Sequence, residues 1–332
     1  MSEIRYDLID DEFVIIAPER LRKPDSYKEK EKISIKDCPF CPGNEDLTTK
    51  AIFTLGNGSS WKVRVIPNLY KALKIETPLV FSDVGIYEKI EGFGAHEVII
   101  DTPRHLLRMD EFTLEEIYNW LYVIKLRAVD LKNDKRLIDL VFFKNHGKLA
   151  GASQSHPHTQ LLGLPIISKH NLHILKRAYN YYKEHGRAIF DDIITNELNE
   201  DKRVLFTSRS FVAFTPYASG FAFEVMILSK KFNSILDLEH EDLKELSTVF
   251  KKVIDALYKE LGEFDFNIFF NNPPINPNFE TKEFFDDIKD FWRFSIKIAP
   301  RIYGLAGFEL STNIKINPVV PERAASLLRK SI

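Results

Sequence analysis

Cysteine is scarce in this sequence, with only two among 332 residues. That scarcity excludes a disulfide-stapled scaffold and favours a reducing compartment, so we expect a cytoplasmic protein. No apolar run approaches the roughly 18 residues of a membrane span. The first residues, MSEIRYDLIDDEF, lack the basic start and the apolar stretch of a signal peptide.

An excess of charge of one sign is lacking as well. The 46 basic and 48 acidic residues leave a net charge of −2, which provides no long-range field for nucleic acid or an anionic membrane. The hydrophobic share of 44% is that of an ordinary globular protein. A chain of 332 residues is long enough for one large domain or two smaller ones with a sizeable core.

Both cysteines lie in one short segment, KDCPFCPGNED, as Cys38 and Cys41. Such a C-x-x-C pair can bind a metal or form a redox dithiol, and redox pairs usually open a helix after a buried strand. Here a proline follows each cysteine and PGNED is typical of a turn, which favours a metal site. A tetrahedral site needs two further ligands, and nine histidines are candidates.

The chain contains an internal repeat. A shift of 127 residues places Glu97 on Glu224 and lays VFFKN (141–145) over IFFNN (268–272). Between these anchors both copies carry apolar residues at intervals of three and four, which predicts a long helix in each. Consecutive strands of alternating character favour antiparallel pairing. The sequence therefore predicts an α+β fold built from two related halves.

The two halves, residues 1–180 and 181–332, differ in their reactive residues. Residues shared by both copies serve the fold, so residues present in only one copy are candidates for chemistry. We therefore expect a catalytic first half and a degenerate second half. In the repeat, Cys38 and Cys41 correspond to Ala188 and Asp191, His105 to Phe232, and the pair His156 and His158 to Arg293 and Ser295.

The reactive residues of the first half include a ligand set for one metal ion. Cys38, Cys41, His105 and one of His156 and His158 would make a Cys₂His₂ site. Such a site is closed and structural, because protein fills all four positions. His105 has an ordinary alternative as a cap or surface residue, and its loss in the second copy favours the metal role.

His156 and His158 flank Pro157 in the segment GASQSHPHTQ. Proline favours an extended chain here, and residues two apart in an extended chain face the same side, about 6.6–7 Å apart. One imidazole can therefore bind a metal while the other faces a ligand. A neutral imidazole is a good nucleophile, and its attack on phosphorus gives a covalent N–P intermediate.

Small and polar residues around this pair suit a phosphate group. Gly151 allows close approach of backbone N–H groups, and Ser153 can hold phosphate oxygens. Gln160 lies two residues beyond His158 and shares its face. The alternative is a His-rich loop that binds a second metal ion, but Ser153 and Gln160 are poor metal ligands.

The segment NHGKLAGASQSHPHTQ resembles the active-site signature of the galactose-1-phosphate uridylyltransferases, a branch of the histidine-triad superfamily. Five other segments resemble that family in the same order, so the resemblance covers nearly the whole chain. It implies a duplicated histidine-triad-like fold with antiparallel sheets, and a homodimer. The five segments are APERLRKP, CPFCPGNE, VIPNLYKAL, HEVIIDTPRH and AGFELSTNIKINPVVPERAA.

The resemblance also implies a role for each matching residue. The implied zinc ligands are Cys38, Cys41, His105 and His156. The implied catalytic residues are His158 as the nucleophile, with Gln160 and Ser153. The implied substrate-binding residues are Arg20, Lys23, Asn68, Tyr70, Asn145, Gly151, Ser153 and Gln160.

The implied reaction is a ping-pong transfer between a nucleotide sugar and a sugar phosphate. His158 would take the uridylyl group from UDP-glucose and release glucose-1-phosphate, and galactose-1-phosphate would then receive the group. The alternative is an enzyme that uses the same histidine on an ADP-sugar or a dinucleoside polyphosphate, with phosphate as the acceptor.

The sequence departs from the family pattern in three places. The second half lacks the residues of a second family metal site, so we expect no second metal and apolar packing in its place. Ser155 stands where proline is more frequent. Lys23 replaces an arginine, which keeps the charge but removes a two-pronged phosphate contact.

Overall fold

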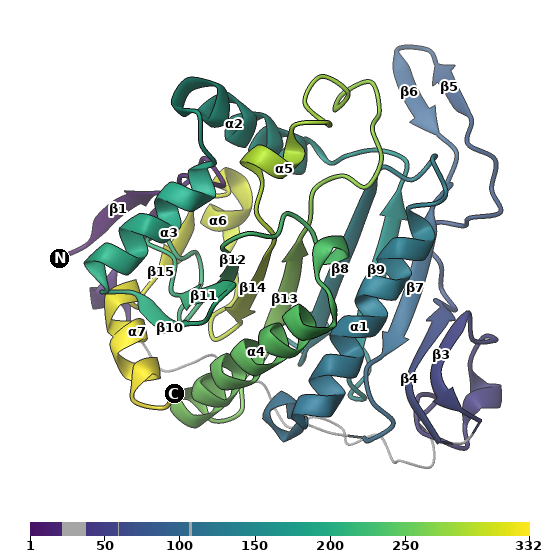
Figure 1. Ribbon diagram of the computed structural model, residues 1–332, viewed down its shortest axis with the longest axis horizontal. Helices are drawn as coiled ribbons and strands as arrows, with labels where there is room; N and C mark the ends of the chain where they lie inside the picture. Colours follow the sequence, from purple (N-terminus) through teal and green to yellow (C-terminus); the bar gives the residue numbers. More distant parts are fainter. Residues whose placement is uncertain (22–37, 59, 106–107) are drawn as a thin grey trace.

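The computed structural model describes residues 1–21, 38–58, 60–105 and 108–332. A ten-stranded antiparallel sheet forms its centre (Figure 1). Strands β8 and β13 pair at the middle of the sheet and join the two halves. In spatial order the strands are β10 (Val204–Thr207), β11 (Phe211–Phe214), β12 (Val225–Ser229), β14 (Ser295–Pro300), β13 (Phe266–Asn271), β8 (Asp139–His146), β9 (His158–Leu164), β7 (Ala95–Ile100), β4 (Ser60–Pro67) and β3 (Phe53–Asn57).

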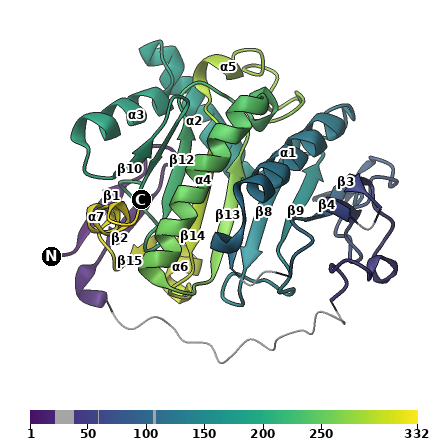
Figure 2. The same ribbon diagram turned by 60° about the horizontal axis from the view of Figure 1, so that its bottom comes forward.

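Two long helices, α1 (Leu114–Leu131) and α4 (His240–Leu261), lie side by side on one face of this sheet (Figures 1 and 2). Trp120 of α1 packs between Phe250 of α4 and Phe270 of the sheet, with ring centroids 5.3 and 5.6 Å away. One continuous core thus spans both halves. The predicted α+β class, the antiparallel pairing and the pair of long helices are confirmed.

The opposite face carries a second apolar cluster. It packs three helices against strands of the second half: α2 (Lys169–His185), α3 (Ile189–Glu200) and α5 (Ile288–Phe291). Among the described residues no helix has the length and apolar character to cross a membrane. The smaller elements are β5 (Phe81–Val84), β6 (Tyr87–Ile90), η1 (Pro18–Arg20), η3 (Glu45–Leu47), η4 (Met109–Glu111), η5 (Ile235–Asp237), α6 (Gly307–Thr312) and α7 (Pro321–Arg329).

The two ends of the chain meet in a separate three-stranded sheet. Strands β1 (Glu3–Tyr6) and β2 (Phe13–Ile16) are antiparallel, and β15 (Lys315–Asn317) adds to β2 in parallel. The N-terminal strands therefore contact residues from the end of the chain. The division into residues 1–180 and 181–332 stays a prediction.

Across the long helices and the strands β8 and β13 the two copies are 126 residues apart, so the predicted shift of 127 is wrong by one there. The N-caps of the long helices, Thr113 and Glu239, are 126 apart. A shift of 127 would place Phe142, which is 1% exposed in the core, on Phe269, which is 37% exposed on the other face. A one-residue slip in a strand turns every side chain to the opposite face, while the similarity between two apolar runs barely changes.

This register predicts that replacing Phe142 and replacing Phe269 lower the stability of the protein by unequal amounts. Phe142→Ala should lower the free energy of unfolding by about 3–5 kcal/mol, because it opens a cavity in the core. Phe269→Ala should cost about 1 kcal/mol, the typical value for a point substitution. Urea unfolding of both variants measures the difference, and equal losses would show that the two side chains share one environment.

Candidate functional site

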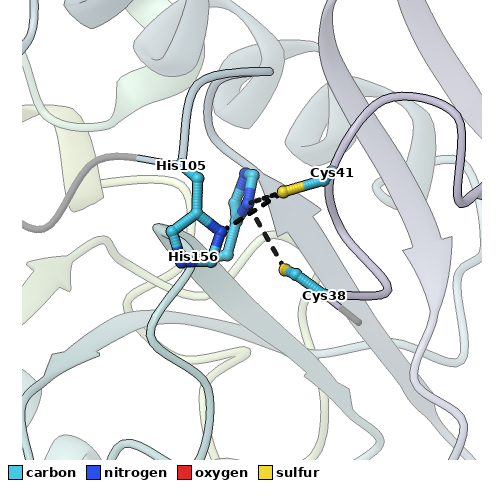
Figure 3. A group of neighbouring side chains, drawn as sticks. All are labelled: Cys38, Cys41, His105 and His156. Carbon is cyan, nitrogen blue, oxygen red and sulfur yellow. Dashed lines mark hydrogen bonds between the residues drawn. The ribbon is translucent and has the colours of Figure 1, made fainter. Parts of the chain in front are cut away.

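Four side chains from distant loops converge on one point (Figure 3). Cys38 Sγ and Cys41 Sγ each lie 3.6 Å from His156 Nδ1, and Cys41 Sγ lies 3.2 Å from His105 Nδ1. Tetrahedral bonds of the lengths that zinc makes to sulfur and nitrogen would hold such atoms about 3.6 Å apart. The residues therefore fit a single tetrahedral metal ion, and the predicted metal-ligand set is brought together.

Local hydrogen bonds orient these ligands. Cys41 N–H donates to the carbonyl of Cys38, which closes the turn that the prolines and PGNED predict. His156 Nε2 lies 2.9 Å from the carbonyl of Thr102. Since a carbonyl only accepts, the proton of this ring is on Nε2 and the lone pair of Nδ1 points at the two sulfur atoms. This carbonyl thus selects the tautomer that a metal ligand needs.

Burial alone favours the neutral forms of these groups. It raises the pKa of the Cys41 thiol to about 12, with a further contribution from the adjacent Cys38. It also lowers the pKa of His156 to about 4, so this ring is neutral at physiological pH. A bound cation would stabilise the thiolates, so metal binding here would release protons.

His158 is the first residue of β9 and does not belong to this cluster. It is 6% exposed, and its Nδ1 lies 2.9 Å from the carbonyl of His156. Nδ1 therefore carries the proton and Nε2 keeps its lone pair. Burial, and after it the Lys144 cation, lowers the pKa of His158. The ring is a neutral imidazole held in the tautomer that can attack through Nε2.

A second histidine, His96, connects two of the predicted substrate residues. The backbone N–H of Ala72 donates to His96 Nδ1 over 3.0 Å, so a neutral ring carries its proton on Nε2. That Nε2 lies 3.3 Å from Gln160 Oε1 and 3.1 Å from Asn68 Nδ2. His96 opens the segment HEVIIDTPRH, which resembles the family, but no role could be assigned to it from the sequence. Its contact with Gln160 follows from the pairing of their two strands.

The loop before His156 is held by the second half. Gly147 has φ +83°, and a Cβ there would lie 1.8 Å from the carboxylate of Asp265, so only glycine fits. That carboxylate accepts the backbone N–H of Leu149 over 2.7 Å. Asn267 Nδ2 donates to Asn145 Oδ1 over 2.8 Å. The predicted phosphate loop is thus tied to β13 on one side, while Gly151 has open space around its Cα.

Some predicted residues do not join the site within one chain. Arg20 ends η1, directly after β2, and β2 pairs with β15. Figures 1 and 2 place this small sheet and β9 on opposite sides of the molecule. Lys23 lies outside the described residues. Tyr70 is exposed, and its backbone N–H donates to Asn68 Oδ1 over 2.8 Å.

The sheet register identifies the counterparts of the site in the second half. Phe143 pairs with Gln160 in the first half. Its counterpart at a shift of 126, Phe269, pairs with Lys297. Lys297 therefore occupies the place of Gln160, and the residue two before it takes the place of His158.

That residue is Ser295, in agreement with the sequence alignment. Lys297 Nζ lies 3.1 Å from Asp10 Oδ2 and 3.7 Å from Glu224 Oε1. These side chains line a cavity of about 400 Å³. Around Lys297 the N-terminal segment brings carboxylates over the strand. The expectation of apolar packing concerned the counterparts of the metal ligands, and it is wrong at two of them, because Arg293 Nη2 lies 2.7 Å from Asp191 Oδ2. The absence of a second metal stays a prediction.

Comparisons with known proteins agree with this geometry. A family model described as galactose-1-phosphate uridyl transferase, N-terminal domain, matches residues 1–168, and its C-terminal counterpart matches residues 175–292. An ADP-glucose phosphorylase from Arabidopsis thaliana is 28% identical, over 99% of this chain and 92% of that protein. A galactose-1-phosphate uridylyltransferase from Thermotoga maritima is 27% identical, over 100% and 99%. The crystal structure of an Arabidopsis thaliana ADP-glucose phosphorylase with bound ADP-glucose is similar with a TM-score of 0.83, 26% identity and 99% coverage of both chains.

The geometry predicts that the cluster residues hold the metal ion and that the neighbouring His158 does not. The purified protein should hold about one metal ion per chain, because one closed ligand set is formed. Cys38→Ser should lose the ion and lower the free energy of unfolding by about 4 kcal/mol or more. His158→Ala should keep the ion. Elemental analysis and thermal melts measure both, and loss of metal from the His158 variant would contradict the assignment.

Proposed function

Because the chain belongs to the galactose-1-phosphate uridylyltransferase family, whose members are nucleotidyltransferases, we propose that His158 carries the nucleotidyl group as a covalent intermediate. The observation that supports this role is the fixed tautomer of the ring. Nδ1–H donates to the His156 carbonyl, so the lone pair of Nε2 is free for attack. Among the residues that the structure describes, both ring nitrogens of His105 and of His156 face the cluster or a hydrogen-bond partner.

The proposed reaction has two balanced steps. In the first, the Nε2 lone pair of His158 forms a bond to the α-phosphorus, and the bond from that phosphorus to the bridging oxygen breaks, which releases a sugar-1-phosphate. In the second, an oxygen of the acceptor phosphate attacks the same phosphorus and the N–P bond breaks. The Nδ1–H···O=C bond stabilises the positive charge on the ring while the nucleotidyl group is attached.

The other predicted residues take supporting roles in this proposal. Gln160 and Ser153 would donate to the charge that develops on the phosphate oxygens, and Asn145 and Gly151 would shape the phosphate loop. Asn68 and Tyr70 would contact the nucleoside, and His96 would hold Gln160 through its Nε2–H.

Zinc is the metal that we propose for the Cys₂His₂ set. Two thiolates and two imidazoles in tetrahedral positions are typical of structural zinc. When bound, the ion would link the loops of Cys38, His105 and His156 and so hold the start of β9 in place. Two buried, unpaired thiols also suit the reducing cytoplasm, which we retain as the proposed location.

We propose uridylyl transfer from UDP-glucose to galactose-1-phosphate as the reaction. A second candidate is transfer of an adenylyl group from ADP-glucose to phosphate. It is supported by the Arabidopsis thaliana ADP-glucose phosphorylase, whose ADP-glucose complex aligns over 99% of this chain. Both candidates use the same histidine and differ in the nucleoside and the acceptor.

A homodimer would explain the position of Arg20. In one chain this residue ends η1, directly after the small sheet, which lies at the far side of the molecule from β9. An arginine that contacts phosphates must therefore reach the site of a second copy. We propose that two chains associate so that the small sheet of each lies near the phosphate loop of the other.

Intact-mass measurement distinguishes the two reactions. Incubation with UDP-glucose should add about 306 Da, and incubation with ADP-glucose about 329 Da, as covalent nucleotidyl adducts. His158→Ala should give neither adduct and should lose at least about 10³-fold in transfer rate, as expected for the loss of a nucleophile. His185→Ala, at the end of α2, is the matched control and should behave as the unchanged protein. An adduct on the His158 variant would contradict the proposal.

A further inference from the structure

A buried ion pair lies behind the nucleophile, on the helix-covered face of the sheet. Lys144 Nζ is 2.7 Å from Asp101 Oδ2, and the side chains are 1% and 0% exposed. Lys144 follows Phe142 by two residues on β8, so both point toward the core. The ring of His158 is on the other face. The proposed reaction as described assigns no role to either charged group.

The ion pair lies where the pairing between two strands ends. Strands β8 and β9 pair from Asp139 and Leu164 to Phe143 and Gln160, and the pairing stops before His158. On its other side, His158 still pairs with Ile100 of β7. The chain separates from β8 at this point because residues 147–155 form the phosphate loop. The separation of the two strands therefore leaves the start of β9 without a neighbour on one side.

Lys144 supplies the missing hydrogen bond. The carbonyl of Pro157 points to β7, where it accepts the backbone N–H of Asp101. Successive carbonyls of a strand point in opposite directions, so the next one, that of His158, points toward β8. No backbone donor of β8 pairs there, and Lys144 Nζ donates to it over 3.1 Å. A side chain thus holds the nucleophile's own peptide group.

Asp101 connects this bond to the metal-binding arm, the loop that begins after β7 at Asp101 and leads to the predicted metal ligand His105. It directly follows β7 and precedes Thr102, whose carbonyl orients His156. The same loop continues to His105. One ammonium group therefore joins the end of β7, the end of β8 and the start of β9. A shift of the metal-binding arm would move Asp101, and through the ion pair with Lys144 it would move the peptide group of His158.

Stability alone does not explain such a pair. Burying two charges costs several kcal/mol, and apolar side chains of similar volume often serve stability equally well. Asp101 Oδ1 has no hydrogen-bond partner among the described residues, so the desolvation of this carboxylate is only partly offset. An apolar side chain would fill the space but would donate to neither the carboxylate nor the carbonyl.

We propose that Lys144 and Asp101 are positioning residues for the nucleophile, which hold the His158 peptide where the β8–β9 pairing is open and couple its position to the metal-binding arm. This inference rests on the proposed function of His158. It assigns to the ion pair an effect on the rate of the covalent step rather than on substrate affinity. A displacement of the reacting atom by about 1 Å can reduce a rate about 100-fold.

The test uses a double variant, Lys144→Met with Asp101→Asn. It removes both charges and keeps similar shapes, so neither group is left as an unpaired buried charge. The matched control is Arg127→Met with Glu97→Gln. Arg127 and Glu97 form another buried pair on the same face, with a distance of 2.8 Å, and contact neither histidine. Melting temperature and metal content are measured for both, followed by the single-turnover rate of adduct formation with UDP-glucose and ADP-glucose.

The Lys144/Asp101 variant should fold, keep its metal and form the adduct about 10- to 100-fold more slowly, with KM within about twofold of the unchanged protein. The Arg127/Glu97 variant should keep the rate. The variant Lys144→Gln with Asp101→Asn restores a hydrogen-bond donor without the charge, and it should recover part of the lost rate of adduct formation.

Three results would overturn the inference: an unchanged rate in the Lys144/Asp101 variant, an equal loss in the control, or a loss that matches the loss of metal. A protein that forms no adduct before any substitution would refute the proposed function itself, and the inference with it.

Discussion

The hydrogen bond from His158 Nδ1 to the carbonyl of His156 is the interaction on which the site depends. Together with the bond from His156 to Thr102, it gives the two imidazoles of one short segment different tautomers. His156 turns Nδ1 to the cysteines because its Nε2 donates to Thr102, and His158 keeps Nε2 free because its Nδ1 donates to His156. The proline between them keeps the chain extended, so each ring has its own environment. In the proposed mechanism, a change in either tautomer would remove a metal ligand or the nucleophile.

The duplicated sheet explains how such a site is held. The loop of residues 147–155 begins where the pairing of β8 and β9 ends, and the second half stabilises it through Asp265, just before β13, and Asn267 of β13. The second copy has kept the strands and the long helix but has replaced the chemistry. Its counterparts of His158 and Gln160 are Ser295 and Lys297, beside a cavity that the N-terminal segment lines with carboxylates. One copy therefore serves as the scaffold for the other.

The sequence was sufficient for the fold class, the paired long helices and the grouping of Cys38, Cys41, His105 and His156 into one cluster, because these depend on residue type and period. It placed the repeat one residue out of register, since apolar runs such as VFFKN and IFFNN match almost equally well at neighbouring shifts, whereas the sheet distinguishes their faces. It gave no sign that Arg20 lies far from β9 in one chain. It also could not identify Lys144 or His96, because their roles depend on where strand pairing stops and on which side chains meet across it.

The central claim is that phosphorus becomes bonded to one imidazole, that of His158. Peptide mapping tests it most directly: the protein is quenched with base during turnover of a nucleotide sugar, digested, and the fragments are sequenced by mass spectrometry. The account predicts the nucleotidyl group on the peptide that contains residues 151–160, at His158. A group found at His156, at another residue, or at no residue while turnover continues would contradict it.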